Sequence, residues 1–335
     1  MRETNYGIIS DIHEDPRIVP LAIDVLKSEG TEKLLVNGDI GRLMPGRDLQ
    51  EAIGNAHQYT GFILRKIGES GLDSYVQPGS HETLLGFEPV AEWARQFKNI
   101  TLIDESTKIE QNGHDLVFLP GSDFLCGGEY KIGNDNLRFS GRYFGGGELG
   151  RKFSDWRVYL DAINQGWDKG AFAYANMNSL KRIVTNPEKT VIVCHIPRKF
   201  NNLETAVDVA EFVQAEVDFV HNGRTIKKGA IRPAAMIDPE AYPVKVRKEN
   251  RGNVDLGLIY DEIGLTEEGI AFPTGHFHES GHRACDKDGN HIAEGEFTKG
   301  LYWNSGHLDV GQTGVLTIKD GKASYQNINL RDYLK

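Results

Sequence analysis

Several short apolar runs of the sequence end in residues that can bind a metal ion or move a proton. The residues of these types are, in chain order, Asp11, His13, Asp39, His81, His195, His276 and His278. Carboxylates mixed with imidazoles suit Mn, Fe, Zn or Ni. Two carboxylates and four or five histidines exceed the needs of one tetrahedral ion. They suit two ions that share a bridging carboxylate, a centre able to clamp the oxygens of an in-line displacement at phosphorus.

The runs that precede these residues have the composition of buried β-strands. They cover residues 6–10, 33–37, 74–77, 190–194 and 270–273. Helix-like stretches lie between the first of them, at residues 16–29, 47–69 and 86–97. Alternation of strand and helix predicts parallel pairing in an α/β sheet. Because ligands gather at the carboxyl ends of parallel strands, we expect the polar residues to converge there.

The end of the chain has a different pattern. Residues 289–330 contain short strand-like runs separated by glycines, such as 314–318 and 323–325. This pattern favours antiparallel pairing. The expected architecture is therefore two sheets packed as a sandwich, with helices outside.

Two stretches have the composition of insertions. Residues 121–170 are rich in glycine and aromatic residues and are expected to form a cap over the strand ends. Residues 222–252 contain eight basic and three acidic residues, a local excess of five positive charges. We interpret them as a basic loop, with a solvated surface loop and a holder of an anionic substrate as equally open alternatives.

The composition bounds the protein class. The chain of 335 residues has 48 acidic and 38 basic residues, a net charge of −10, which disfavours a protein that coats nucleic acid. Its three cysteines, Cys126, Cys194 and Cys285, argue against a disulfide framework. The sequence has no run of eighteen apolar residues and no secretion-type start, so we expect a cytoplasmic protein without membrane spans.

The ordered set Asp-x-His, Gly-Asp, Gly-Ser-His-Glu, His-x-Pro and Gly-His-x-His resembles the motifs of the calcineurin-like metallophosphoesterases. The resemblance covers residues 6–13, 36–42, 76–82, 190–197 and 271–279, and in outline most of the chain outside the two insertions. It implies one domain over residues 1–335, with a two-sheet β-sandwich flanked by helices in an α/β/β/α order.

The resemblance also assigns roles to the motif residues. Asp11, His13 and His278 would hold one metal ion, Asp39 would bridge, and His195 and His276 would hold the second. His81 would act beside the phosphate as a charge stabiliser or general acid. Glu82 would orient His81.

The sequence departs from the family pattern at Ser80, where an asparagine usually binds the second metal. A serine hydroxyl is shorter and a poorer neutral ligand, so Ser80 is either a weak ligand or a simple turn residue. The segment 38–42 also lacks the Gly-Asp-x-Val-Asp-Arg-Gly string of the protein serine/threonine phosphatases.

The resemblance implies a dinuclear metal-dependent phosphoesterase in which a metal-bridging hydroxide attacks phosphorus, with a phosphodiester favoured over a phosphomonoester. Arg42 and Arg198 closely follow ligand motifs and are candidate clamps for an anionic phosphate-ester substrate. His221 is a further candidate metal ligand, and His307 is expected to lie near the site. Two alternatives stay open: a nuclease acting on DNA or RNA, and a catalytically weak metal-binding scaffold.

Overall fold

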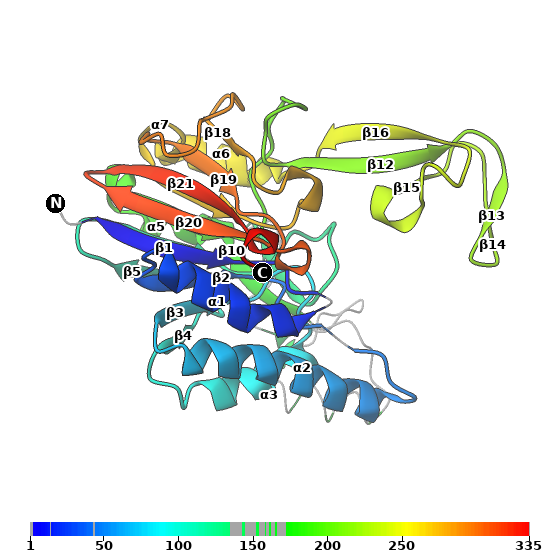
Figure 1. Ribbon diagram of the computed structural model, residues 1–335, viewed down its shortest axis with the longest axis horizontal. Coiled ribbons are helices and arrows are strands. Elements are labelled where there is room, and N and C mark those ends of the chain that lie inside the picture. The colour runs from blue at the N-terminus through cyan, green and yellow to red at the C-terminus, as the bar shows by residue number, and fades with distance from the viewer. Residues whose placement is uncertain are drawn as a thin grey trace.

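The computed structural model is of mixed α/β type (Figure 1). It describes residues 3–13, 15–42, 44–134, 143–144, 152–153, 158, 161, 165 and 172–334. Within these residues, two six-stranded sheets form the body, and three smaller sheets accompany them.

The first large sheet is built mainly from the N-terminal part of the chain. Its strands, in spatial order, are β21 (Lys322–Asn329), β20 (Gln312–Lys319), β1 (Thr4–Ile9), β2 (Lys33–Asn37), β3 (Asp73–Gln77) and β4 (Ile100–Leu102). The run from β1 to β4 is parallel, whereas β20 pairs antiparallel with β1 and β21. The antiparallel pairing expected near the C-terminus is therefore confirmed for this hairpin.

The second large sheet holds the later metal-ligand candidates. Its strands, in spatial order, are β18 (Ala284–Cys285), β19 (Leu301–Asn304), β17 (Ala271–Thr274), β11 (Thr190–Cys194), β6 (Asp115–Leu119) and β5 (Thr107–Glu110). The four central strands are parallel. The C-terminal ends of β11 and β17 therefore lie at the same edge.

Burial on both faces explains the continuous apolar runs of the central strands. Successive side chains of a strand point to opposite faces. Ile8 contributes to the core cluster that draws on both large sheets, whereas Ile9 contributes to the cluster shared with the N-terminal helices. In β6, Phe118 lies in the shared core and Val117 in a cluster with the later helices.

The α-helices in the described part of the chain are α1 (Val19–Ser28), α2 (Leu49–Glu69), α3 (Leu84–Ala94), α5 (Leu180–Ile183), α6 (Val254–Glu262) and α7 (Leu265–Glu268). The 3₁₀ helices are η1 (Pro16–Ile18), η2 (Met177–Ser179), η3 (Pro187–Lys189), η4 (Ala234–Met236), η5 (His278–Ser280), η6 (Leu308–Val310) and η7 (Leu330–Tyr333). Side chains cap the long helices: Asp48 accepts a hydrogen bond from Glu51 N, and Thr83 from Gly86 N. Within the described chain, no helix combines the length and apolarity needed to cross a bilayer.

A β-ribbon projects from the body, and we call residues 209–251 the arm (Figure 1). The strands β12 (Val209–Ala215) and β16 (Val244–Asn250) pair antiparallel along seven residues, and β15 (Ile231–Pro233) adds to β12. The hairpin of β13 (Phe219–His221) and β14 (Arg224–Ile226) lies farthest out. The stretch 222–252 is thus part of a strand-built arm that begins earlier in the chain, instead of the expected loop.

The expected cap at residues 121–170 lies largely outside the described residues. Its described parts include β7 (Tyr130–Gly133), β8 (Tyr143–Phe144) and β9 (Lys152–Phe153), which form a small sheet with β10 (Phe172–Asn176). Tyr130 is buried beneath α3, where its hydroxyl donates to Glu88 at 2.7 Å. This aromatic residue therefore belongs to the core.

Replacing Phe118 by alanine tests the core shared by the two large sheets. The Phe118 side chain is fully buried, so we expect a loss of about 3–5 kcal/mol in the free energy of unfolding. Urea denaturation followed by circular dichroism measures it. Phe297→Ala, at a position 38% exposed, is the matched control and should cost much less. Equal effects of the two substitutions would contradict this packing.

Candidate metal centre

The carboxyl ends of six parallel strands bring the candidate ligands together. Asp11 and His13 follow β1, Asp39 follows β2, and Ser80 and His81 follow β3. From the second sheet, His195 follows β11, His276 and His278 follow β17, and His307 follows β19. The parallel topology thus places residues that are distant in sequence at one edge of the molecule.

Three overlapping groups of side chains could each hold a metal ion. They are Asp11 with His13 and His278, Asp39 with His195 and His276, and His13 with Asp39 and His81. Within each group the ligand atoms lie within 4.8 Å of one another. The first two groups have the membership that the motif resemblance implied for the two metal ions.

Short distances also join the first two groups. His13 Nε2 lies 3.7 Å from Asp39 Oδ2, and His195 Nε2 lies 3.9 Å from Asp11 Oδ1. Each carboxylate therefore faces histidines of both groups, and the groups form one contiguous cluster.

Three of these residues have left-handed backbone conformations. The φ angle is 57° at Asp11, 55° at Asp39 and 67° at His276. For residues other than glycine this conformation costs on the order of 1–3 kcal/mol. Each residue comes just after a strand, so the left-handed turn redirects its side chain from the sheet into the cluster.

Two glycines allow the carboxylates to sit this close to the backbone. A Cβ atom on Gly79 would collide with Asp39 Oδ1, and one on Gly275 would collide with Asp11 Oδ2. The glycines of the Gly-Ser-His-Glu and Gly-His-x-His motifs are thus needed for close approach.

Hydrogen bonds hold the buried carboxylates. Asp39 accepts from the backbone N–H of Ser80, from Ser80 Oγ at 2.7 Å and from His81 N at 2.8 Å. Asp11 accepts from Ser10 Oγ and from His276 N, which lies 3.2 Å from both carboxylate oxygens. In the described part of the chain no lysine or arginine pairs with either carboxylate.

The ring orientation of His195 fits a metal ligand. Its Nδ1 lies 2.8 Å from the carbonyl oxygen of Asn37, which can only accept, so Nδ1 carries the proton. Nε2 is buried and makes no hydrogen bond, although Asp39 Oδ2 lies 3.1 Å away. A buried imidazole nitrogen without a hydrogen bond, beside two carboxylates, has the chemistry of a divalent-metal ligand.

The pKa values follow from burial and mutual charge. Burial alone would lower the pKa values of His13 and His195, but the carboxylates of Asp11 and Asp39 raise them to about 9 and about 10. Burial and the neighbouring His195 lower the pKa of His276 to about 4. Burial would raise the pKa values of Asp11 and Asp39, yet the histidines hold both below their usual range. Without metal, protons on His13 and His195 therefore balance the carboxylates.

The structure shows what the Ser80 hydroxyl contacts, at the position where the motif resemblance implied an asparagine ligand. Its hydroxyl donates to Asp39 Oδ2, the carboxylate that would bridge the two ions. A donor in this position orients Asp39 and lowers the charge on that oxygen. Ser80 thus acts on the cluster through Asp39.

The contacts of Glu82 differ from the expected orientation of His81. Its buried carboxylate accepts backbone N–H groups of Asp39, Ile40, Gly41 and Gly79. Burial and the nearby Asp39 charge raise its pKa to about 7. None of its described hydrogen bonds reaches the His81 ring, so Glu82 clamps the turns that carry Asp39 and Ser80.

The predicted substrate clamps do not lie in the pocket over the cluster. Arg198 packs over the rings of Phe200 and Tyr302, at 4.9 and 5.1 Å from their centroids, and donates to the Lys287 carbonyl. The Arg42 Nε donates to the sulfur of Met44. Proximity to a motif in sequence did not indicate the direction of either side chain.

The pocket over the cluster has a volume of about 410 Å³. The described residues that line it are His13, Asp39, Ser80, His81, Asp123, Leu125, Cys126, Gly127, Ala210, Glu211, Phe212, Pro233, Ala235, Arg251, His276, Phe277, His278 and Glu279. The first residues of the expected cap and the base of the arm therefore contribute to its wall.

Sequence reasoning assigned no role to Asn37 and Cys126, and it considered Arg251 only as one of the basic residues of the stretch 222–252. Asn37 donates to the carbonyls of Cys194 and Pro273 and thereby ties β2 to β11 and β17. Cys126 Sγ lies 3.1 Å from His276 Nε2, and burial raises the pKa of its thiol. Arg251 lines the pocket. The strand-end position of Asn37 and the basic composition around Arg251 were usable signals, whereas nothing in the sequence marked Cys126.

The two further candidates, His307 and His221, lie at different distances from the candidate metal ligands. The His307 ring stacks on His278, with a centroid distance of 4.1 Å and an interplanar angle of 12°. It therefore borders the first group. His221 lies in β13 on the outer hairpin of the arm and does not line the pocket.

No family model and no curated protein sequence matches this chain. The structure is similar to a crystal structure of a protein without a stated name, with a TM-score of 0.53, 14% identity, and coverage of 97% of this chain and 99% of the other. It is also similar to TT1561 of Thermus thermophilus, with a TM-score of 0.50, 10% identity, and coverage of 98% and 100%. At these identities the similarity concerns the fold.

Metal binding should release protons. At pH 7.5 His13 and His195 are below their pKa values of about 9 and about 10, so both are protonated without metal and must lose a proton to bind it. Affinity for Mn²⁺ should therefore rise as the pH approaches 9. Calorimetric titration in two buffers of different ionisation enthalpy should give about two protons released per protein.

The matched variant for this titration is His13→Gln. This substitution removes one of the two protonated ligands, so the number of protons released per protein should fall by about one. Release that is zero in the wild type, or unchanged in the variant, would contradict the assigned protonation.

Proposed function

We propose that this protein is a dinuclear metal-dependent phosphoesterase of the calcineurin-like type, with a phosphodiester as the favoured substrate. The observation that carries the proposal is the position of Asp39 Oδ2, which lies 3.1 Å from His195 Nε2 of one candidate group and 3.7 Å from His13 Nε2 of the other, while His13 and His195 each approach Asp11 as well. A shared carboxylate between two sets of histidines is the ligand arrangement that a pair of ions needs.

The architecture supports the same proposal. The two large sheets share one hydrophobic core, and each sheet forms a further hydrophobic cluster with the helices on its other face. This arrangement agrees with the α/β/β/α order that the motif resemblance implied. We therefore propose the metallophosphoesterase fold for the body, with the arm as an addition to it.

When bound, two divalent ions would activate water and stabilise the charge on the phosphoryl oxygens. Asp11, His13 and His278 would hold one ion, His195 and His276 the other, and Asp39 both. The centroids of the His81 and His13 rings are 4.2 Å apart, and His81 lines the pocket, where it would contact the phosphate or the leaving oxygen. Glu82 and Ser80 would keep Asp39 in place through their hydrogen bonds.

A metal-binding scaffold without turnover is the alternative. It rests on Ser80, which occupies the motif position where the resemblance implied an asparagine ligand and whose hydroxyl donates to Asp39. Activity measurements on metal-loaded protein distinguish the two proposals.

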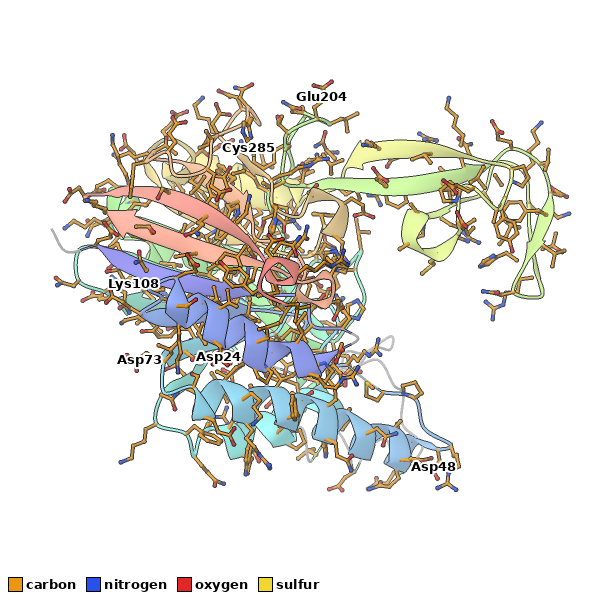
Figure 2. The ribbon with its side chains drawn as sticks, in the orientation of Figure 1. Asp24, Asp48, Asp73, Lys108, Glu204 and Cys285 are labelled. Carbon is orange, nitrogen blue, oxygen red and sulfur yellow. The ribbon has the colours of Figure 1, made fainter. Side chains whose placement is uncertain are left out.

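We expect Mn²⁺-loaded protein to hydrolyse bis-p-nitrophenyl phosphate. Asp39→Asn should reduce the rate to background, because a neutral amide cannot bridge two cations as a carboxylate does. The rate of p-nitrophenolate release, with metal content determined in parallel, measures this. Asp24→Asn on the exposed side of α1 makes the same chemical change away from the cluster and should retain activity (Figure 2).

Folded wild type that binds metal but shows no turnover with any divalent ion would favour the scaffold. Equal activity of the Asp39 and Asp24 variants would refute the proposed role of Asp39.

Replacing His81 by alanine separates catalysis from metal binding. If His81 acts on the substrate, kcat should fall about 10²- to 10⁴-fold while both metal ions are retained. Because His81 also belongs to a candidate group with His13 and Asp39, metal analysis is the deciding measurement. Loss of one ion in this variant would make His81 a ligand instead. His291→Ala, an exposed position, is the control.

A further inference from the structure

The arm is anchored directly beside the metal-binding cluster. Ser280, two residues after His278, donates to the Val209 carbonyl at 2.7 Å and accepts from Val209 N at 3.0 Å. Asp208 is fully buried, and its carboxylate accepts from Asn250 Nδ2 at 2.7 Å and from Gly252 N at 3.1 Å. Both strands of the arm are therefore fixed where they leave the body.

The fixed base of the arm forms part of the pocket wall. The arm residues that line the pocket are Ala210, Glu211, Phe212, Pro233, Ala235 and Arg251. Most of them are apolar, and Glu211 is paired with Lys248 at 3.1 Å. The rest of the arm extends away from the body, with side chains projecting to both sides (Figure 2).

Arg251 is the only lysine or arginine among the described residues that line this pocket. The same wall holds the carboxylates of Asp123, Glu211 and Glu279. An anionic ligand entering the pocket therefore meets acidic side chains, and one fixed cation outside the metal-binding cluster.

The Arg251 guanidinium is positioned but still available. Its Cζ lies 5.2 Å from the centre of the Phe212 ring, and its backbone N–H donates to the Asp208 carbonyl at 2.9 Å. The contact of its Nη1 with Glu249 is long, at 3.4 Å, and the side chain is 47% exposed. A guanidinium stacked on an aromatic ring loses little freedom on binding, and its planar fork matches phosphate oxygens.

We propose that Arg251 is the anion-binding residue of this pocket and that the arm base selects phosphoesters bearing an apolar group. The inference rests on the proposed function, since it names the residues that recognise the substrate of the same site. Arg251 contacts the phosphoryl oxygens, while Phe212, Pro233 and Phe277 line the space for the apolar group. Arg251 thus takes the role that the sequence had suggested for Arg42 and Arg198.

Binding of phenylphosphonate to Mn²⁺-loaded protein tests this inference without turnover, because the P–C bond is not hydrolysed. We expect Arg251→Ala to weaken its Kd about tenfold or more, which corresponds to about 1.4 kcal/mol. Arg251→Lys should recover part of the loss, since it restores the charge but not the fork. Isothermal titration calorimetry gives Kd for each variant, and metal content confirms equal loading.

Arg247→Ala is the matched control. Arg247 lies in β16 on the same arm and approaches the same Glu249, at 3.5 Å, but does not line the pocket. The substitution makes the same change in net charge, so it should leave Kd unchanged. An equal loss in the two variants would mean a long-range charge effect and would overturn the role of Arg251.

The outcomes separate this inference from the proposed function. Normal hydrolysis of bis-p-nitrophenyl phosphate with an unchanged phenylphosphonate Kd in Arg251→Ala overturns only the inference. If the wild type shows no turnover, and the Kd for phenylphosphonate is weakened in Arg251→Ala but not in Arg247→Ala, the proposed enzymatic function is overturned and the anion-binding role of Arg251 is supported. Failure of the wild type to bind phenylphosphonate overturns the inference. In an active enzyme we expect Arg251→Ala to raise KM much more than it lowers kcat.

Discussion

Two carboxylates buried side by side are the constraint on which the rest of this structure depends. Asp11 and Asp39 are almost completely buried, and within the described chain neither has a lysine or arginine partner. A buried charge requires compensation by hydrogen bonds and opposite charge. Backbone N–H groups, the Ser80 hydroxyl and protonated histidines supply it in the metal-free protein. Divalent cations would replace those protons.

The need to compensate these buried charges also determines the conformation of the turns and strand ends around Asp11 and Asp39. Left-handed backbone at Asp11, Asp39 and His276 is tolerated because the surrounding hydrogen bonds fix each turn. Glu82 gathers the N–H groups of two turns, and Asn37 joins strands of both sheets. Hydrogen bonds therefore hold the turns of the cluster without any ion, and hydrogen bonds of Asp208 and Ser280 hold the arm base that adds a wall to the pocket.

Sequence reasoning was most successful where a residue's position follows from its backbone. Asp39 and His195 follow the ends of parallel strands, and the ends of parallel strands meet at one edge, so their convergence followed from the pattern. It failed where a side chain chooses among several directions. Glu82 is adjacent to His81 yet turns to the backbone of Asp39 and Gly79, and Arg198 packs on Phe200 and Tyr302. The basic stretch 222–252 contains the strands β14, β15 and β16, and their pairing partners β12 and β13 begin before it, so the stretch taken alone did not indicate these strands.

The sequence by itself determined the kind of residue at each strand end, the parallel α/β class, and hence the neighbourhood of the candidate metal ligands. These properties are local, since periodicity and turn residues encode them within a few positions. Only the tertiary structure decided that the Ser80 hydroxyl donates to Asp39, that Cys126 lies against His276, and that Arg251 lines the pocket. Those contacts join segments more than forty residues apart, and their geometry is set by packing, which no single stretch of sequence contains.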